Sequence, residues 1–268
     1  FSLINPEPVR MELRNGTAIR AVLTGLSISI TYLARSWISK ADKVICVSKR
    51  QADIVSKNIP GIKDNIVVIH NPLPSVIEVE RIEKSKTPLL VYAGGENYVK
   101  GFAFFLEALP KLLRLKANLQ VLLVGKYTKC AHKLRQLEKQ CKGKLKLLGY
   151  VTRKELLKLY STAWAVLVPS IWEEPLPYTV VEAMLCGTIP VASRVGGIPE
   201  IVAGTYAEKY LFRPSDVKEM VLKVKEIISS DRQVLETIGY NLRELLSRKF
   251  DIVKVKQLIV KLMEGTMV

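Results

Sequence analysis

The sequence predicts an α/β fold, a doubly wound parallel sheet accompanied by a partial N-terminal domain. From about residue 88 onward, short apolar runs alternate with segments in which apolar residues recur every three or four positions. Runs such as LLVYA and VLLV are apolar without alternation, which is typical of strands covered on both faces. The repeated order of strand, helix and strand favours a parallel sheet with helices on both sides.

Each expected element follows from this reading. The strands of the sheet are expected at residues 88–94, 119–125, 144–151, 164–170, 189–193 and 209–212. The helical segments between them read FAFFLEALPKLLRL, AHKLRQLEKQC, RKELLKLYSTA, YTVVEAMLC and IPEIVAG. Three further helices are expected near residues 215–229, 232–248 and 251–264, because apolar residues there keep the same spacing.

The first 75 residues have a different pattern. A long helical stretch is followed by a strand at 41–48, which leads into a helix at Lys49, and by a strand at 65–74 that ends in a connector rich in proline. So few elements cannot bury the face of a sheet, so this segment is expected to be the end of another domain. Its apolar run at 21–34 is too short to cross a bilayer, and a buried helix is favoured over one lying on a membrane surface.

The composition limits the function classes. Hydrophobic residues make up 49% of the 268 residues, which excludes a disordered chain, and 7% aromatic residues give no stacking platform for nucleic acid. The formal charge of +16 favours polyanionic partners, although a solvated, lysine-rich surface explains it equally well. The four cysteines lack metal-ligand spacing and there are only two histidines, so neither a metal site nor a disulfide framework is expected. A reducing cytosol is the expected compartment.

Ligands of an open parallel sheet bind beyond the carboxyl ends of its strands. After the first strand, Gly94 and Gly95 permit a tight turn, and Lys100 lies beside the start of the next helix, where a phosphate is favoured. After the second strand, Lys126 lies close to the strand end. Taken singly, each loop is equally consistent with a glycine turn and an exposed lysine.

Two further loops at the same edge carry acids and glycines. The stretch WEEPLPYTVVEAMLCG places Glu174 in a loop and Glu182 about a turn and a half inside a helix. Ionised carboxylates accept strong hydrogen bonds, so the two could hold the hydroxyl groups of a sugar and a ribose, or they could be ordinary surface acids. The loop SRVGGIPE brings Gly196 and Gly197 before a helix, which predicts a cradle of backbone amides for an anion.

These motifs together identify a resemblance. YAGG…KGFAFFLEAL, LLVG, LLGYV…ELLKLY, the two glutamates separated by seven residues, and GTIPVASRVGGIPEIV resemble the retaining glycosyltransferases of family 4, which use nucleotide sugars and have the GT-B architecture of two Rossmann-like domains. The match covers about residues 41–265. The combined pattern is far more specific than any single motif.

The resemblance implies roles for individual residues. Lys100 resembles the lysine that grips the donor diphosphate, and Glu174 the first motif glutamate, which faces the transferred sugar and the charge that develops there. Glu182 resembles the second motif glutamate, which holds the ribose hydroxyls. The other donor-site positions that the resemblance implies are backbone segments: the base-binding Gly149, Tyr150 and Val151, the amides around Leu176 and Tyr178, and the second glycine loop of Gly196 and Gly197.

The chain departs from the family pattern at three points. Gly95 stands where an arginine is usual, five residues before Lys100, so the diphosphate loses one cation; either Lys126 replaces it or the grip is weaker. Pro177 stands where glycine is common and removes one N–H. Most of an N-terminal acceptor domain is missing, so the resemblance implies a remnant at 1–75, a nucleotide-sugar domain at 76–248, and a C-terminal helix at 249–268 that crosses back toward the N-terminal part.

The expected activity is transfer of a sugar from a nucleoside diphosphate sugar to an acceptor hydroxyl with retention of configuration, without metal or cofactor. The acceptor is open between a lipid-linked molecule and a polysaccharide, and attachment to the inner face of the membrane is also left open. The alternative is a nucleotide-sugar-binding half protein, inactive alone, that is a fragment or pairs with a separate acceptor chain. Nucleic acid is not expected as a partner.

Overall fold

A computed structural model describes residues 18, 22, 28–72 and 82–265 of the chain. The chain divides into two compact units, one made of residues 1–72 together with 252–268 and the other of residues 73–251. The larger unit holds all the predicted site residues. The expected assignment of the smaller unit to an acceptor-domain remnant stays a prediction.

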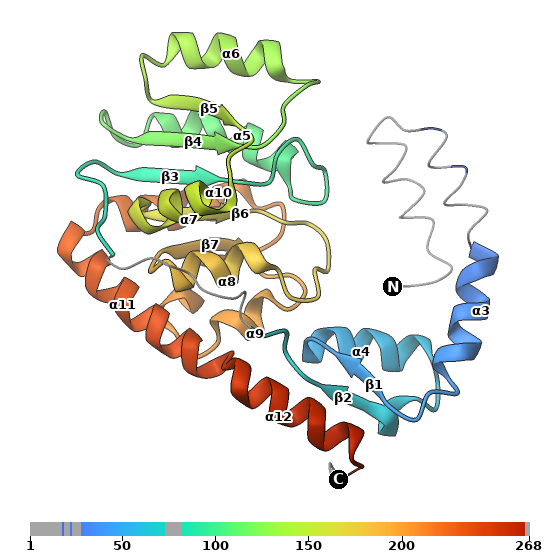
Figure 1. The fold of residues 1–268 in the computed structure, drawn as a ribbon. Coiled ribbons are helices and arrows are strands. Elements are labelled where there is room, and N and C mark those ends of the chain that lie inside the picture. The colour runs from blue at the N-terminus through green and yellow to red at the C-terminus, as the bar shows by residue number, and fades with distance from the viewer. Residues whose placement is uncertain (1–17, 19–21, 23–27, 73–81, 266–268) are drawn as a thin grey trace. The chain divides into compact units, whose positions relative to one another are not determined.

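The larger unit is built on a six-stranded parallel sheet with the strand order β5-β4-β3-β6-β7-β8 (Figure 1). The strands are β3 (Leu89–Tyr92), β4 (Gln120–Val124), β5 (Leu145–Gly149), β6 (Ala165–Val168), β7 (Ile189–Ser193) and β8 (Leu211–Phe212). Strand β3 pairs with β4 on one side and with β6 on the other, so the order of strands reverses at β3 and β6. The doubly wound parallel sheet predicted from the sequence is confirmed.

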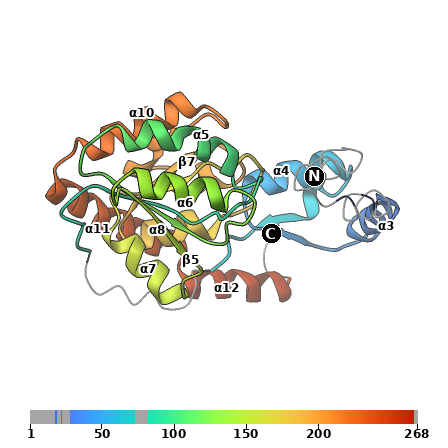
Figure 2. The same cartoon turned by 90° about the horizontal axis from the view of Figure 1, so that it is seen from above.

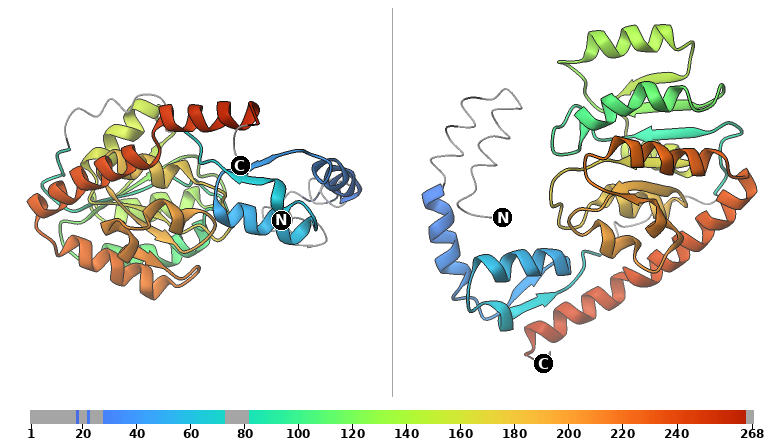
Figure 3. Two further views of the ribbon diagram at one scale, coloured as in Figure 1. Left: turned by 90° about the horizontal axis from the view of Figure 1, so that it is seen from below. Right: turned by 180° about the vertical axis from the view of Figure 1, so that it is seen from behind.

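Helices cover both faces of this sheet (Figures 2 and 3). On one face, α5 (Phe102–Leu113) packs against α10 (Val217–Ile228). On the other face, α8 (Tyr178–Leu185) packs against α7 (Arg153–Thr162) and α11 (Arg232–Lys249). Helix α6 (Ala131–Gln140) lies beside the edge strand β5, and the short α9 (Ile198–Val202) follows β7. Two-sided cover explains why the central strands are predominantly apolar.

The core lies where these layers meet. Every residue of β3, β6 and β7 is buried. Tyr92 at the end of β3 stacks on Phe105 of α5, with ring centroids 4.2 Å apart. The Tyr92 hydroxyl also donates to the Gly95 carbonyl at 3.1 Å, which anchors the loop after β3 to the core. The Tyr92 side chain therefore both packs in the apolar core and anchors the first loop of the expected site.

Helix starts follow their capping residues. Thr152 and Glu155 form a reciprocal capping box at the start of α7. The carboxylates of Asp216 and Asp231 accept backbone N–H groups at the starts of α10 and α11. These local contacts explain why helices expected from apolar spacing alone begin within two or three residues of the predicted positions.

One expected strand is confirmed only in its second half. The sequence predicts a strand at 209–212, but Tyr206–Tyr210 form a 3-10 helix and only Leu211–Phe212 pair with β7 as β8. The side chain of Thr205 accepts the N–H of Ala207 and so caps this turn. A local side-chain bond therefore outweighs the strand preference of the aromatic residues.

The smaller unit contains α3 (Ile28–Ile38), β1 (Val44–Cys46), α4 (Lys49–Asn58), a 3-10 turn (Lys63–Asn65), β2 (Ile66–Val68) and α12 (Ile252–Met263). Strands β1 and β2 pair in parallel. Strand β1 is shorter than the predicted 41–48, and β2 is shorter than the described part of the predicted 65–74, of which residues 73 and 74 lie outside the described residues. The apolar stretch 21–34 lies only partly inside the described residues.

Helix α3 does not show the expected burial in the part where side chains are described. Leu33 is 58% exposed and Trp37 is 73% exposed. In the described part of the chain, no helix is both long and apolar enough to cross a membrane. The four cysteines are free thiols, and the described residues contain no cluster of side chains suited to a metal ion.

Candidate functional site

The centre of the candidate site lies where the strand order reverses, between the loops that follow β3 and β6. The ammonium of Lys100 donates to Oε2 of Glu174 at 2.5 Å, although the two residues are 74 positions apart. Oε1 of the same carboxylate accepts the hydroxyl of Ser170. Both oxygens of Glu174 are therefore oriented, and the side chain is only 13% exposed. The predicted lysine and the first predicted acid lie together at the position where open α/β sheets bind ligands.

Close backbone packing holds these two loops together. Gly101, the N-cap residue of α5, has a φ of +71°, and a Cβ there would lie 1.7 Å from the carbonyl oxygen of Pro169. The N–H of Ile171 donates to the carbonyl of Val99 at 3.0 Å. Only glycine permits this approach. Lys100 is thus held between a glycine and a loop-to-loop hydrogen bond, directly opposite Glu174.

Gly94 and Gly95 shape the turn after β3. A Cβ on Gly94 would lie 2.4 Å from the Tyr92 hydroxyl, and Gly95 has a φ of +58°. The N–H of Glu96 donates to the carbonyl of Lys126 at 3.2 Å, so this turn rests against the loop after β4. Both glycines are required for the shape of the turn. Their predicted contact with the donor stays a prediction.

The start of α6 carries its own anion. The Glu96 carboxylate accepts the N–H groups of Thr128, Lys129 and Cys130 at 2.7–2.9 Å. Partial burial alone would raise the pKa of Glu96, but these backbone donors outweigh it and hold the pKa below its ordinary value. The helix N-terminus beside Lys126 is therefore already occupied by a carboxylate of the chain.

The second predicted acid pairs with an arginine that the sequence reading missed. Oε1 of Glu182, on α8, accepts Nε–H of Arg153 at 3.2 Å. Arg153 is the first residue of α7, which begins just after the predicted base segment 149–151. The side chain of Glu182 is only 14% exposed, so it is largely buried where it meets the more exposed Arg153. The position of Arg153 in the first helical turn after a strand end is the signal in the sequence that could have identified this residue.

The glycine loop after β7 supports Glu174 through its backbone. The N–H of Gly197 donates to the Glu174 carbonyl at 2.9 Å, and the N–H of Gly196 donates to the Glu173 carboxylate at 2.9 Å. A Cβ on Gly196 would lie 2.0 Å from the Glu174 carbonyl oxygen. The expected cradle for an external anion is thus not free in this structure, because both amides already bond to oxygens of the chain. Glu173 was not anticipated from the sequence.

The start of α8 offers unused amides. Pro177 precedes the helix and makes no side-chain cap. Within the residues that the structure covers, the N–H groups of Leu176 and Tyr178 donate to no protein acceptor. Free amides at a helix start favour a negatively charged or oxygen-rich group. They lie within four residues of Glu174, which agrees with the predicted role of this turn.

The remaining predicted residues lie around a neighbouring pocket of about 520 Å³, bounded by the loop after β4, by α6 and by the end of β5. Lys126, Gly149 and Tyr150 line it, whereas Val151 follows in the connection to α7. Gly149 has a φ of +67° and accepts the N–H of Gly125 at 2.7 Å, which joins the two strand ends. Lys126 therefore faces this pocket, and among the described residues no hydrogen bond or ion pair joins its side chain to Lys100 or Glu174.

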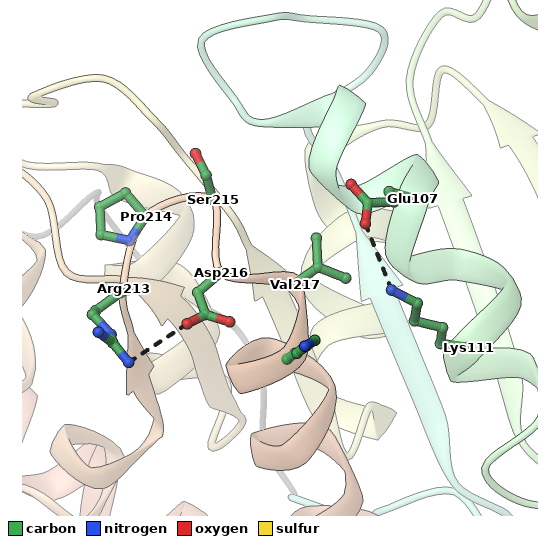
Figure 4. A pocket seen from close by; sticks show the side chains of 8 residues that line it. Glu107, Lys111, Arg213, Pro214, Ser215, Asp216 and Val217 are labelled. Atoms are coloured by element: carbon green, nitrogen blue, oxygen red, sulfur yellow. Dashed lines mark ion pairs between the residues drawn. The ribbon is translucent and has the colours of Figure 1, made fainter.

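A second pocket of about 500 Å³ lies between α5 and the loop after β8 (Figure 4). Its charges are largely paired with each other: Lys111 with Glu107 at 3.5 Å and Arg213 with Asp216 at 3.7 Å. None of the predicted site residues lines it. This pocket therefore adds nothing to the candidate site.

The comparison with protein families identifies the larger unit. Residues 77–245 match the family model of glycosyl transferases group 1. Over 178 residues the chain is 29% identical to the uncharacterized glycosyltransferase MJ1607 of Methanocaldococcus jannaschii, covering 60% of this chain and 44% of that protein. Over 234 residues it is 27% identical to MJ1178 of the same organism, covering 86% and 61%. The chain thus spans about half the length of these relatives.

Solved structures share the fold. The chain aligns with HepE of Anabaena in complex with UDP and glucose at a TM-score of 0.70 and 22% identity, covering 87% of this chain and 66% of that one. It aligns with sucrose-phosphate synthase of Thermosynechococcus elongatus at a TM-score of 0.67 and 21% identity, covering 87% and 60%. At these identities the likeness extends to the fold alone.

Proposed function

Because the chain belongs to the family of glycosyl transferases group 1, we propose that it carries the donor half of an enzyme that transfers a sugar from a nucleoside diphosphate sugar to a hydroxyl group. The observation that carries the proposal is the contact between Lys100 and Glu174 at the point where the strand order reverses. A cation for the diphosphate and an acid for the sugar are adjacent there.

In the proposed reaction, the bond between the anomeric carbon and the β-phosphate oxygen breaks, and a bond to the acceptor oxygen forms on the same face of the sugar. The transition state resembles an oxocarbenium ion. Lys100 and the free amides at the start of α8 stabilise the negative charge that builds on the departing diphosphate. The acceptor proton passes to the leaving phosphate oxygen. Glu174 stabilises the positive charge on the sugar, and Glu182 holds the ribose.

Lys100 can serve the diphosphate without abandoning Glu174. An ammonium group has three hydrogens, so it can donate to the carboxylate and to a phosphate oxygen together. The pair seen in this structure therefore orients the lysine toward the place where the leaving group would lie. Retention of configuration belongs to this proposal and follows from the resemblance to family 4.

The direct test measures nucleotide binding and turnover by variants of this chain. HepE is solved with UDP-glucose, which makes UDP and UDP-glucose suitable first probes. Lys100→Met should weaken UDP binding by roughly tenfold or more, since a charged hydrogen bond contributes about 1.5–3 kcal/mol. Glu174→Gln should leave UDP affinity within about threefold while lowering donor hydrolysis. Glu107→Gln, an acid in the other pocket, is the matched control and should change neither.

Two outcomes would contradict the proposal. If Lys100→Met bound UDP as tightly as the parent protein, the lysine would not meet the diphosphate. If Glu174→Gln lost UDP affinity as strongly as Lys100→Met, the acid would act on the nucleotide and not on the sugar. Affinities come from calorimetry and hydrolysis from released UDP.

The second candidate is a nucleotide-sugar-binding half protein that needs a separate acceptor chain. It is favoured by the exposed apolar side chains of α3, where Leu33 and Trp37 are more than half exposed. This candidate predicts UDP binding without sugar transfer by the chain alone. Recovery of transfer on adding an acceptor-domain protein would distinguish it from an enzyme that is active by itself.

A further inference from the structure

Positive charge is concentrated at one edge of the larger unit. Residues 126–150, which form the loop after β4, helix α6 and strand β5, contain eight lysines or arginines and one acid. Residues 151–251 contain thirteen lysines or arginines and thirteen acids, so their formal charges cancel. The segment 126–150 therefore supplies seven of the sixteen excess positive charges of the whole chain. Such a concentration attracts a negatively charged partner to this edge.

Five of these cations have exposed side chains: Lys133, Arg135 and Lys139 on α6, Lys142 in the turn that follows, and Lys146 on β5. We call these five side chains the basic edge. Within the part of the chain that the structure covers, none of them forms an ion pair. Their positive charge is therefore not neutralised by acidic side chains of the described chain.

The basic edge lies at the outer end of the sheet. Strand β5 is the edge strand of the six, and α6 lies beside it (Figure 1). An open edge strand can pair with a strand of another chain, but here the Glu138 carboxylate accepts the N–H of Leu147 at 2.9 Å. A partner at this edge would therefore meet side chains rather than extend the sheet.

Two large apolar side chains lie among these cations. Leu148 is 37% exposed and lies on the same face of β5 as Lys146, two residues before it. Tyr150, just after the strand, is 81% exposed. Arg135 and Lys139 of α6 line the same pocket as Leu148 and Tyr150, so these apolar groups are neighbours of the basic edge. The surface thus combines unpaired cations with apolar groups that water covers poorly.

We infer that the basic edge, together with Leu148 and Tyr150, docks on the anionic surface of a lipid bilayer. Anionic headgroups supply the negative potential that attracts lysine and arginine. The layer beneath the headgroups accepts apolar side chains, and tyrosine rings favour this interface. A nucleic acid duplex also offers phosphates, but it has no apolar layer that would cover Leu148. The inference rests on charge and exposure, so it stands apart from the proposed reaction.

The experiment measures how the full chain sediments with vesicles of two compositions, phosphatidylcholine alone and an equimolar mixture of phosphatidylcholine and phosphatidylglycerol. We expect binding to the mixed vesicles only. The binding should be lost as salt rises from about 0.1 M to about 1 M, because the screening length then falls from about 10 Å to about 3 Å.

The decisive variant is Lys133→Gln/Lys142→Gln/Lys146→Gln. Each lysine near an anionic leaflet raises the partition coefficient about fivefold, so this variant should bind the mixed vesicles about tenfold or more weakly. Lys158→Gln/Lys218→Gln/Lys225→Gln is the matched control, because it removes the same charge from exposed positions on α7 and α10. Screening limits the reach of these distant lysines, so the control should stay within about threefold of the parent.

A second variant tests the apolar part of the surface. Leu148→Ser/Tyr150→Ser should lower the partition coefficient severalfold and leave its salt dependence unchanged, because it removes apolar area and no charge. The replaced side chains of all three variants are exposed, so folding should remain intact, which a thermal melt checks. If Leu148→Ser/Tyr150→Ser bound as tightly as the parent, the patch would act by charge alone and the bilayer would lose its advantage over other polyanions.

Three further outcomes would overturn the inference. Absence of binding to the mixed vesicles at low salt would leave the basic edge as a solvated surface. Equal weakening by the two triple variants would mean that net charge governs binding rather than this edge. Tighter binding to a DNA duplex than to mixed vesicles, at equal phosphate concentration, would make a nucleic acid the partner. UDP affinity of the Lys133→Gln/Lys142→Gln/Lys146→Gln variant should equal that of the parent, so failure of docking leaves the proposed function standing.

Discussion

Gly196 offers a sharp test of how the glycine loop supports the candidate site. A Cβ at this position would lie 2.0 Å from the carbonyl oxygen and 2.6 Å from the nitrogen of Glu174. A Cβ atom cannot lie this close to backbone atoms, so Gly196→Ala must move the backbone that carries Glu174. The hydrogen bonds that the Gly197 N–H donates to the Glu174 carbonyl and the Gly196 N–H donates to the Glu173 carboxylate should break together.

The size of the effect follows from these contacts. An alanine at a φ of +55° costs roughly 1–2 kcal/mol from backbone conformation alone. The neutral hydrogen bond adds about 1 kcal/mol and the bond to the carboxylate about 1.5–3 kcal/mol. Gly204 separates these contributions, since it has a φ of +74° and no atom within 4 Å of its Cβ position. Gly204→Ala should therefore lose only the conformational part, and Gly196→Ala about 2.5–4 kcal/mol more.

The assay has two parts. Urea unfolding measures the free energy of unfolding of both variants, and hydrolysis of UDP-glucose reports on Glu174. We expect Gly196→Ala to lower hydrolysis strongly while Gly204→Ala keeps the parent rate. Equal stability losses in the two variants would refute the packing argument. A Gly196→Ala protein that is destabilised yet hydrolyses the donor at the parent rate would refute the link between this loop and Glu174.

Three other perturbations follow from the structure. Glu182→Ala should weaken UDP binding by about 1–3 kcal/mol if the acid holds the ribose, and an unchanged dissociation constant by calorimetry would exclude that role. Burial lowers the pKa of Lys84 to about 7, so below that pH the buried amine must be protonated, which opposes folding. The free energy of unfolding should therefore rise between pH 7 and 10. In Lys84→Met the midpoint of urea unfolding should not rise over this pH range. Glu96→Gln should lower stability by about 1 kcal/mol at pH 7, a difference that should shrink as the parent carboxylate is protonated at acid pH, and equal midpoints at pH 7 would contradict the cap at α6.

The sheet could be predicted because its strands are buried on both faces. Apolar runs without alternation leave few other structures, so all six strands were found and five of them closely, as at 119–125 for Gln120–Val124. The sixth, predicted at 209–212, is confirmed only at Leu211–Phe212, because the side chain of Thr205 caps a 3-10 helix that includes Lys209 and Tyr210. Such a local contact leaves no trace in the hydrophobic pattern. The burial expected of the apolar stretch 21–34 depends on distant contacts, which the pattern does not encode either.

The candidate site was predictable in its main members and not in their partners. The parallel direction of the strands follows from the repeated pattern, and it places the loops with Lys100 and Glu174 at one edge of the sheet. That β3 and β6 are neighbours comes from the structure. Which oxygen bonds to which donor depends on side-chain geometry across loops far apart in the sequence. For this reason Ser170, Arg153 and Glu173 emerged only from the structure. The role of Gly196 and Gly197 toward an outside anion stays a prediction, and in this structure their amides donate to Glu173 and Glu174.

These partners explain why so basic a chain keeps acids at this edge. Glu174 meets Lys100, Glu182 meets Arg153, and Glu96 fills the amides at the start of α6. Each carboxylate fixes a donor that would otherwise be mobile or solvated, so the donors are oriented before a ligand arrives, which is the condition for strong electrostatic stabilisation. On the proposed function, the acids do not oppose the diphosphate. They hold the cation in place for it, and the amides at the start of α8 remain available because no acid of the described chain covers them.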